Sequence, residues 1–153
     1  MLSPRFGDVK ATVLVIDDSA EMQRYLRLML ELESYAVETA NNGIEALQRL
    51  RNGCKPSVIL LDLQMPGMNG FQTLRRLRSS WPDMKVIMCS GVDDPRNAER
   101  ATRLGARAYL TKPVQQLYLS AAIERCLNET ESPSTPMEVE EGNLITLPVP
   151  LTQ

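Results

Sequence analysis

Residues 57–70 of this 153-residue chain read SVILLDLQMPGMNG, an apolar run that ends at Asp62 and continues into a polar turn. A continuously apolar run of this length is typical of a parallel strand that is covered on both faces. A second such run, TVLVI at residues 12–16, is followed by Asp17 and Asp18. Open α/β sheets bind ligands beyond the carboxyl ends of their strands, so these three carboxylates are expected to share one edge of a sheet.

Strand and helix patterns alternate five times, which predicts an α/β fold of parallel strands joined by right-handed crossovers. The predicted strands lie at residues 12–17, 35–40, 57–62, 85–89 and 106–110. The predicted helices lie at residues 19–33, 42–51, 69–80, 95–104 and 114–128. Their expected apolar faces include Met22, Leu26, Met29, Leu30, Ile44, Leu47, Leu50, Phe71, Leu74, Leu77, Leu117, Ala121, Ile123 and Leu127.

Length and charge predict one domain followed by a tail. Residues 129–153 contain five glutamates and no lysine or arginine, whereas residues 1–128 contain 17 basic and 14 acidic residues, a net charge of +3. We therefore expect a domain at residues 1–128 and an acidic, proline-containing, flexible tail at residues 129–153. The modest positive excess does not favour a dedicated nucleic-acid binder.

The absence of histidine excludes Ser-His-Asp and Cys-His catalysis within the chain. Three cysteines, in a spacing that matches no zinc site, cannot all form disulfides and favour reduced thiols. The sequence shows no signal-peptide pattern and no run of roughly 20 apolar residues that would span a bilayer. These features predict a cytoplasmic protein without membrane contact.

Polar residues also follow the fourth and fifth predicted strands. Ser90 follows the fourth predicted strand, Lys112 follows the fifth, and Tyr109 lies within the fifth. In these residues the sequence resembles the CheY-like receiver domain of two-component response regulators, over about residues 10–128. The matching segments are VIDD at 15–18, LLDLQMPGMNG at 60–70, SG at 90–91 and GARAYLTKP at 105–113.

The resemblance implies a flavodoxin-like, doubly wound, five-stranded parallel sheet with strand order 2-1-3-4-5 and helices on both faces. It also implies that Asp62 accepts a phosphoryl group as an acyl phosphate. Asp17, Asp18, Asp62 and the backbone carbonyl of Gln64 would hold Mg²⁺, with Mn²⁺ as an alternative. Such all-oxygen ligand sets suit Mg²⁺.

By the same resemblance, Lys112 and the Ser90 hydroxyl would contact the phosphoryl oxygens, and the Lys112-Pro113 peptide bond would be cis. Ser90 and Tyr109 would form the switch: the hydroxyl moves toward the phosphate, and Tyr109 turns inward. This change would reshape the surface of the helix at 95–104, the strand at 106–110 and the helix at 114–128.

The resemblance further implies a signalling phosphoacceptor rather than an enzyme, which at most takes phosphoryl groups from small donors and dephosphorylates itself. Its donor would be a histidine kinase or a histidine phosphotransfer protein, and its output a contact with a target protein. With about 25 residues after the domain, no direct DNA binding is expected. A basic strip that comprises Arg96, Arg100, Arg103 and Arg107 is a candidate partner surface, for a homodimer, a target or the chain's own tail.

Other interpretations stay open on the residues alone. Asp17 and Asp18 could cap a helix, Asp62 could form a turn, and the arginines could simply be a solvated helix face. A Mg²⁺-dependent phosphohydrolase with an aspartyl-phosphate intermediate is the alternative function, although Gln64 stands where such enzymes usually carry a second acid. A scaffold that binds partners without phosphorylation is a third interpretation.

Overall fold

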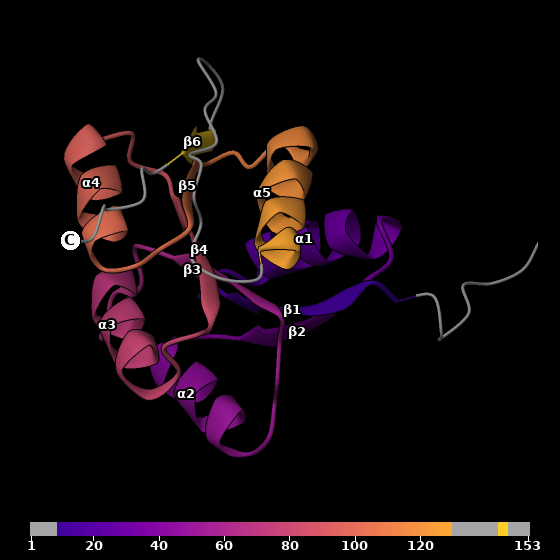
Figure 1. Ribbon diagram of the computed structural model, residues 1–153, viewed down its shortest axis with the longest axis horizontal. Helices are drawn as coiled ribbons and strands as arrows, with labels where there is room; N and C mark the ends of the chain where they lie inside the picture. The colour runs from indigo at the N-terminus through magenta and orange to yellow at the C-terminus, as the bar shows by residue number, and fades with distance from the viewer. Residues whose placement is uncertain (1–8, 130–143, 147–153) are drawn as a thin grey trace, which may run out of the picture.

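Five parallel strands form the centre of the protein in a computed structural model that describes residues 9–129 and 144–146 (Figure 1). The strand order is β2-β1-β3-β4-β5-β6, so the predicted order of the first five strands is confirmed. The parallel strands are β1 Ala11–Ile16, β2 Tyr35–Ala40, β3 Val58–Asp62, β4 Lys85–Ser90 and β5 Ala108–Thr111. The helices between and after them are α1 Ala20–Leu32, α2 Gly43–Arg51, α3 Gly70–Ser80, α4 Pro95–Arg103 and α5 Gln116–Asn128.

Side-chain caps begin four of the five helices. Ser19, Asn42, Asn69 and Asp94 each accept a hydrogen bond from a backbone N–H of the first helical turn. Such caps satisfy donors that have no partner within the helix. The exception is α5, where Gln115 makes no side-chain cap.

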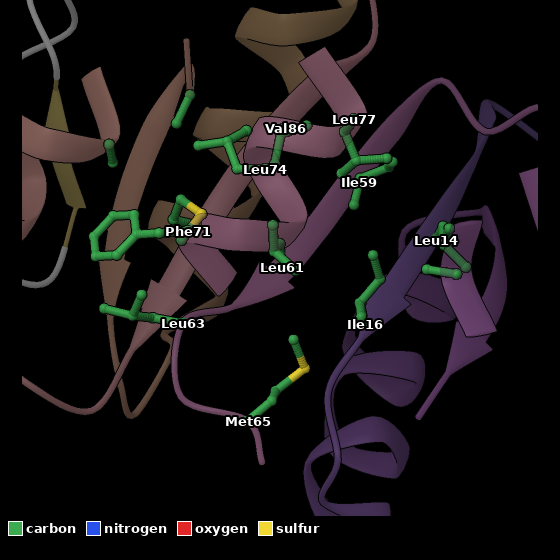
Figure 2. Close-up of a cluster of buried hydrophobic side chains, with 14 of the residues drawn as sticks. Leu14, Ile16, Ile59, Leu61, Leu63, Met65, Phe71, Leu74, Leu77 and Val86 are labelled. Carbon is green, nitrogen blue, oxygen red and sulfur yellow. The ribbon is translucent and has the colours of Figure 1, made fainter. Parts of the chain in front are cut away.

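Two apolar layers lie on opposite faces of the sheet. One packs α2, α3 and α4 against the sheet and includes Leu14, Ile59 and Leu74, which are fully buried; Figure 2 shows its central part. The other packs α1 and α5 against the opposite face and includes Val13, Leu26 and Ile123. Burying both faces of β3 explains why all five of its residues are buried and why the run has no polar alternation.

A sixth strand, β6 Leu144–Thr146, runs antiparallel to β5 at the edge of the sheet. The sequence pattern did not predict this strand, and residues 129–153 were expected to form a flexible tail. The pairing shows that at least these three residues join the sheet, and the remainder of the expected tail, residues 130–143 and 147–153, lies outside the described residues.

Two apolar residues were assigned to the wrong helix face. Ile44 is 58% exposed and Leu117 is 74% exposed. The buried stripe of α2 is Gly43, Ala46, Leu47 and Leu50, and that of α5 is Leu119, Ala122, Ile123 and Cys126. Each stripe follows the i, i+3, i+4, i+7 spacing of a helix face, from which Ile44 and Leu117 are displaced.

Candidate functional site

The predicted site residues gather at the carboxyl ends of four strands. Asp62 is the last residue of β3, and Ser90 is the last residue of β4. Asp17 directly follows β1, and Lys112 directly follows β5. Because β1, β3, β4 and β5 are parallel, these side chains meet at one edge of the sheet.

Asp17, Asp18 and Asp62 form a tight carboxylate cluster. One carboxylate oxygen from each lies within 4.8 Å of the others. Asp17 and Asp62 are only 2% and 4% exposed, whereas Asp18 is open to solvent. Crowded carboxylates repel one another unless a cation lies among them, and three oxygens with a solvent-open side fit a divalent ion that keeps several waters.

Lys112 supplies one positive charge to this cluster. Its Nζ lies 3.1 Å from Asp17 Oδ2 and 3.0 Å from Asp62 Oδ1. The lysine side chain is 19% exposed, so both ion pairs are largely shielded from water. The Lys112-Pro113 peptide bond is cis, as predicted.

The protonation of the site follows from burial and charge together. Burial raises the pKa of the Asp62 carboxyl, Lys112 opposes that rise, and Asp17 adds to it. Burial also acts to lower the pKa of Lys112, but Asp62 and Asp17 outweigh it, and the lysine pKa is raised. One ammonium therefore does not compensate two buried carboxylates, and Asp62 would gain from a second cation.

Backbone N–H groups also orient the two buried carboxylates. Ser19 N–H donates to Asp17 Oδ1 at 2.9 Å, and Gln64 N–H approaches Asp62 Oδ1 at 3.4 Å. The Gln64 side chain itself is exposed at the rim of the site. The Gln23 side-chain amide, which the sequence analysis did not single out, donates to the Asp17 carbonyl at 2.7 Å and holds the loop after β1.

Gly70 is a second residue that sequence reasoning missed as a site determinant. A Cβ at this position would lie 2.5 Å from the Asp62 carbonyl oxygen and 2.6 Å from Leu63 Cα. Its N–H donates to the Leu63 carbonyl at 2.8 Å, so the start of α3 packs directly on the end of β3. The Asn-Gly pair at residues 69–70 was the signal, but it suggested only a turn.

Ser90 and Tyr109 hold the same backbone residue from its two sides. The Ser90 hydroxyl accepts from Val92 N–H at 3.0 Å, and the Tyr109 hydroxyl donates to the Val92 carbonyl at 3.0 Å. Both side chains are fully buried. Tyr109 thus has the inward orientation that the switch hypothesis assigns to the phosphorylated form, and Val92 is the physical link between the two residues.

The predicted basic strip is divided. Arg96, Arg100 and Arg103 are exposed along α4. Arg96 pairs with Asp94 at 3.1 Å, and the Arg100 guanidinium lies over the Phe71 ring at 4.3 Å from its centroid. Arg107 does not belong to this strip. It lies just before the amino end of β5, outside α4, and forms an ion pair with Glu129.

A doubly wound sheet with three carboxylates, a lysine and a hydroxyl at its carboxyl edge defines a signalling receiver. The chain belongs to the response regulator receiver domain family, which it matches over residues 13–124. It is 38% identical over 122 residues to the transcriptional regulatory protein CpxR homolog of Haemophilus influenzae, an alignment that covers 80% of this chain and 52% of the relative.

The chain also resembles receiver domains of known structure. A response regulator receiver domain protein from Clostridium thermocellum superposes with a TM-score of 0.73 at 35% identity, over 77% of this chain and 94% of the other. Chemotaxis protein CheY4 of Vibrio cholerae superposes with a TM-score of 0.70 at 30% identity, over 76% of this chain and 98% of the other.

The chain spans about half the length of the curated relatives it matches. Because those relatives include transcriptional regulators, they lend no support to the expectation that direct DNA binding is absent. Within residues 9–129 and 144–146, no helix has the length and apolar character needed to cross a bilayer.

Proposed function

We propose that Asp62 is the phosphoacceptor of this receiver domain and takes its phosphoryl group from a phosphohistidine on a partner protein. The observation that carries this proposal is the Lys112 ammonium shared between Asp62 and Asp17 in a buried carboxylate cluster. The Asp62 carboxylate can attack phosphorus and form an acyl phosphate while the P–N bond to the donor histidine breaks and its electron pair returns to the imidazole. With no histidine in the chain, the donor histidine belongs to a histidine kinase or a histidine phosphotransfer protein.

Asp17, Asp18 and Asp62, together with the Gln64 backbone carbonyl, would hold Mg²⁺, and Mn²⁺ would fit the same oxygen ligands. The bound ion supplies the positive charge that offsets repulsion between the carboxylate and the incoming phosphoryl oxygens. The Gln64 N–H orients the Asp62 carboxylate, and the Ser19 N–H orients the Asp17 carboxylate. The raised pKa of Asp62 supports this ligand set, because the carboxylate lacks sufficient positive charge in the chain alone.

Lys112 offsets part of the negative charge of the site before transfer and would shift its ion pair from Asp62 to a phosphoryl oxygen afterwards. The Ser90 hydroxyl would bind a second phosphoryl oxygen. That move takes the hydroxyl away from the Val92 N–H, so the backbone that also accepts the Tyr109 hydroxyl is repositioned. The signal would leave the site through this residue toward α4, β5 and α5, and would favour one of two arrangements of that surface.

The decisive experiment is intact-protein and peptide mass spectrometry after incubation with Mg²⁺ and acetyl phosphate. A single acid-labile adduct of one phosphoryl group at Asp62, absent from Asp62→Asn and from samples with a metal chelator, is the expected result. Modification at another residue would overturn the assignment of Asp62. Continuous hydrolysis of the donor without an adduct would favour the phosphohydrolase alternative. Glu38→Gln, an exposed carboxyl on β2, is the matched control that should label normally.

Partner association through the α4–β5–α5 surface is the output that this switch would control. Sedimentation of the chain with and without beryllofluoride and Mg²⁺, a mimic of the phosphorylated state, measures whether a homodimer forms. A mass increase that depends on both additives would support dimerisation through this surface.

A further inference from the structure

Helices α2 and α3 lie side by side on one face of the sheet (Figure 1), and an open groove runs between them. We propose that this groove is a docking site for an acidic amphipathic helix of a partner protein. The partner helix would place an apolar side chain against Ile44 and Met68 and its carboxylates against Arg75 and Arg76. Because α3 separates the groove from α4, this contact is distinct from the α4–β5–α5 surface.

The groove has the dimensions of a short helix. Its volume is about 620 Å³, and α2, α3 and the loop before α3 all contribute to its lining. Along α3 the lining runs from Gln72 to Ser79, a distance of seven residues that rises about 10 Å. Two turns of a partner helix cover the same length and present the side chains at i, i+4 and i+7 on one face. A helix that lies between α2 and α3 would therefore fill the groove from end to end.

Tight packing at the start of α2 places Ile44 on the rim of the groove. A Cβ at Gly43 would lie 2.7 Å from Met68 Cε and would also clash with the Thr73 side chain, so α2 and α3 touch at this point. The next residue, Ile44, is 58% exposed, and Met68 beside it is only partly buried. One exposed aliphatic residue is ordinary. Two apolar side chains in one groove offer a partner surface whose removal from water stabilises the complex.

The wall formed by α3 is positively charged. This helix carries three arginines and no acidic residue. Two of them, Arg75 and Arg76, line the groove and are exposed. Neither forms an ion pair or a side-chain hydrogen bond with any residue that the structure describes. Carboxylates opposite these guanidinium groups would form charge-assisted hydrogen bonds, which can be bidentate.

The lining favours a protein segment over other anionic partners. Small-molecule pockets enclose most of their ligand, whereas Gln72, Arg75 and Ser79 are exposed and leave this groove open along α3. Nucleic acids are held through phosphates and, in single strands, through aromatic stacking. Ile44 and Met68 supply neither contact, and none of the described lining residues is aromatic. An acidic helix with an apolar anchor uses both halves of the groove.

Selection from a library of random peptides of about 12 residues, roughly three helical turns, tests the groove without a known ligand. The full chain is the bait, without Mg²⁺ or a phosphoryl donor, so the result does not depend on whether Asp62 is the phosphoacceptor. Enriched peptides should carry acidic residues and one large apolar residue at helical spacing. Their binding should shift the ¹H–¹⁵N resonances of Ile44, Met68 and residues 72–79. Enrichment of basic or uncharged peptides, or shifts confined to another surface, would overturn the proposal.

Two variants separate the apolar and the charged halves of the groove. Ile44→Ser should weaken binding of the selected peptides about tenfold, because the apolar anchor loses its contact. Arg75→Glu/Arg76→Glu should weaken binding about tenfold or more at low salt, and less at high salt. All three residues are exposed, so the melting temperatures should stay close to that of the parent protein. Unchanged affinity in either variant would overturn the assignment of that half.

Matched changes on other helices are the controls. Leu117 is an exposed apolar residue on α5, and Arg100 and Arg103 are exposed on α4. Leu117→Ser and Arg100→Glu/Arg103→Glu should retain most of the affinity for the peptides. A loss in the α4 variant equal to that in the α3 variant would show general attraction to a basic surface and would overturn the groove. Duplex DNA that displaces the peptides and still binds Ile44→Ser would assign this face to nucleic acid and would overturn it as well.

Discussion

The Lys112 ammonium lies between two buried carboxylates, 3.1 Å from Asp17 and 3.0 Å from Asp62. Removing it leaves two uncompensated acids in a shielded pocket, which is costly in a way that removing an exposed lysine is not. Lys112→Ala should therefore lower the free energy of unfolding by about 2 kcal/mol in Mg²⁺-free buffer. Chemical denaturation measures this loss, and Lys55→Ala, at an exposed loop position, is the control that should stay within about 0.5 kcal/mol of the parent protein.

The same variant separates the roles of the lysine and the metal. If Mg²⁺ binds the carboxylates, it should recover much of the stability that Lys112→Ala loses, because the ion replaces the missing positive charge. The switch should not recover, since no ammonium remains to bind the phosphoryl group. A variant that Mg²⁺ fails to stabilise would contradict the assignment of these carboxylates as metal ligands.

Magnesium should raise the melting temperature of the parent protein, because it binds the folded cluster and not the dispersed carboxylates of the unfolded chain. At a free concentration of about 100 times the dissociation constant, the gain is about 2.7 kcal/mol. Asp18→Asn should reduce this gain at little cost to the apoprotein, since Asp18 is exposed. Differential scanning calorimetry with MgCl₂ against NaCl of equal ionic strength distinguishes a bound ion from screening, and Glu21→Gln serves as the control.

Asp62→Asn should make the protein more stable near neutral pH. Burial raises the pKa of the Asp62 carboxyl, so the folded state binds this proton more tightly than the unfolded state. The contribution of this group to stability is therefore greatest at low pH and is lost as the pH rises through its folded-state pKa. The asparagine amide does not ionise and so avoids the cost of burying a charge. Asp62→Asn should therefore raise the free energy of unfolding by about 1 kcal/mol above that pH, and the gain should disappear in acid. Denaturation across pH 4–8 measures it; a neutral-pH loss would contradict the reasoning.

The local parts of this fold were readable from sequence. The apolar run that ends at Asp62, and the helix patterns that start near residues 19, 42 and 69, depend on neighbours in the chain, so residue pattern alone located β3 and the starts of three helices. The site followed because parallel strands bring their carboxyl ends together. The convergence of Asp17, Asp62 and Lys112 was thus a consequence of topology once the strands were recognised.

The remainder depends on contacts that sequence spacing does not encode. Ile44 satisfies a helical spacing with Leu47, yet the close approach of α2 and α3 at Gly43 sets a different buried face. Arg107 continues the spacing of the α4 arginines, but the helix has already ended before Gly105, whose φ is +99°. The three residues of β6 are too short a run to predict, because only the unpaired edge of β5 gives them a partner.

Gly70 and Gly91 offer a matched pair of alanine substitutions. A Cβ at Gly70 would meet the Asp62 carbonyl at 2.5 Å and Leu63 Cα at 2.6 Å, both backbone atoms that cannot give way cheaply. Gly70→Ala should cost about 2 kcal/mol or more and should also reduce phosphorylation, since the backbone that carries Asp62 must move. Gly91→Ala meets nothing nearer than the Gln64 side chain at 3.9 Å and should leave stability within about 0.5 kcal/mol. Equal effects of the two substitutions on stability would refute this account.

The three thiols should differ sharply in reactivity. Burial raises the pKa of both Cys89 and Cys126 to about 12, and it also raises the pKa of Cys54, but that thiol is only partly buried and stays accessible to reagent. Because the thiolate is the nucleophile, native protein at pH 8 should take one iodoacetamide group, at Cys54, and three after denaturation.

The raised pKa values of Cys89 and Cys126 also predict how stability depends on pH. Between pH 9 and 12 the unfolded chain loses these protons while the folded chain retains them, so stability should fall by a few kcal/mol as pH rises through that window. Cys89→Ala should flatten this decline, and Cys54→Ala should leave most of it; a pH profile with the same slope in both variants would show that the buried thiol does not cause the loss.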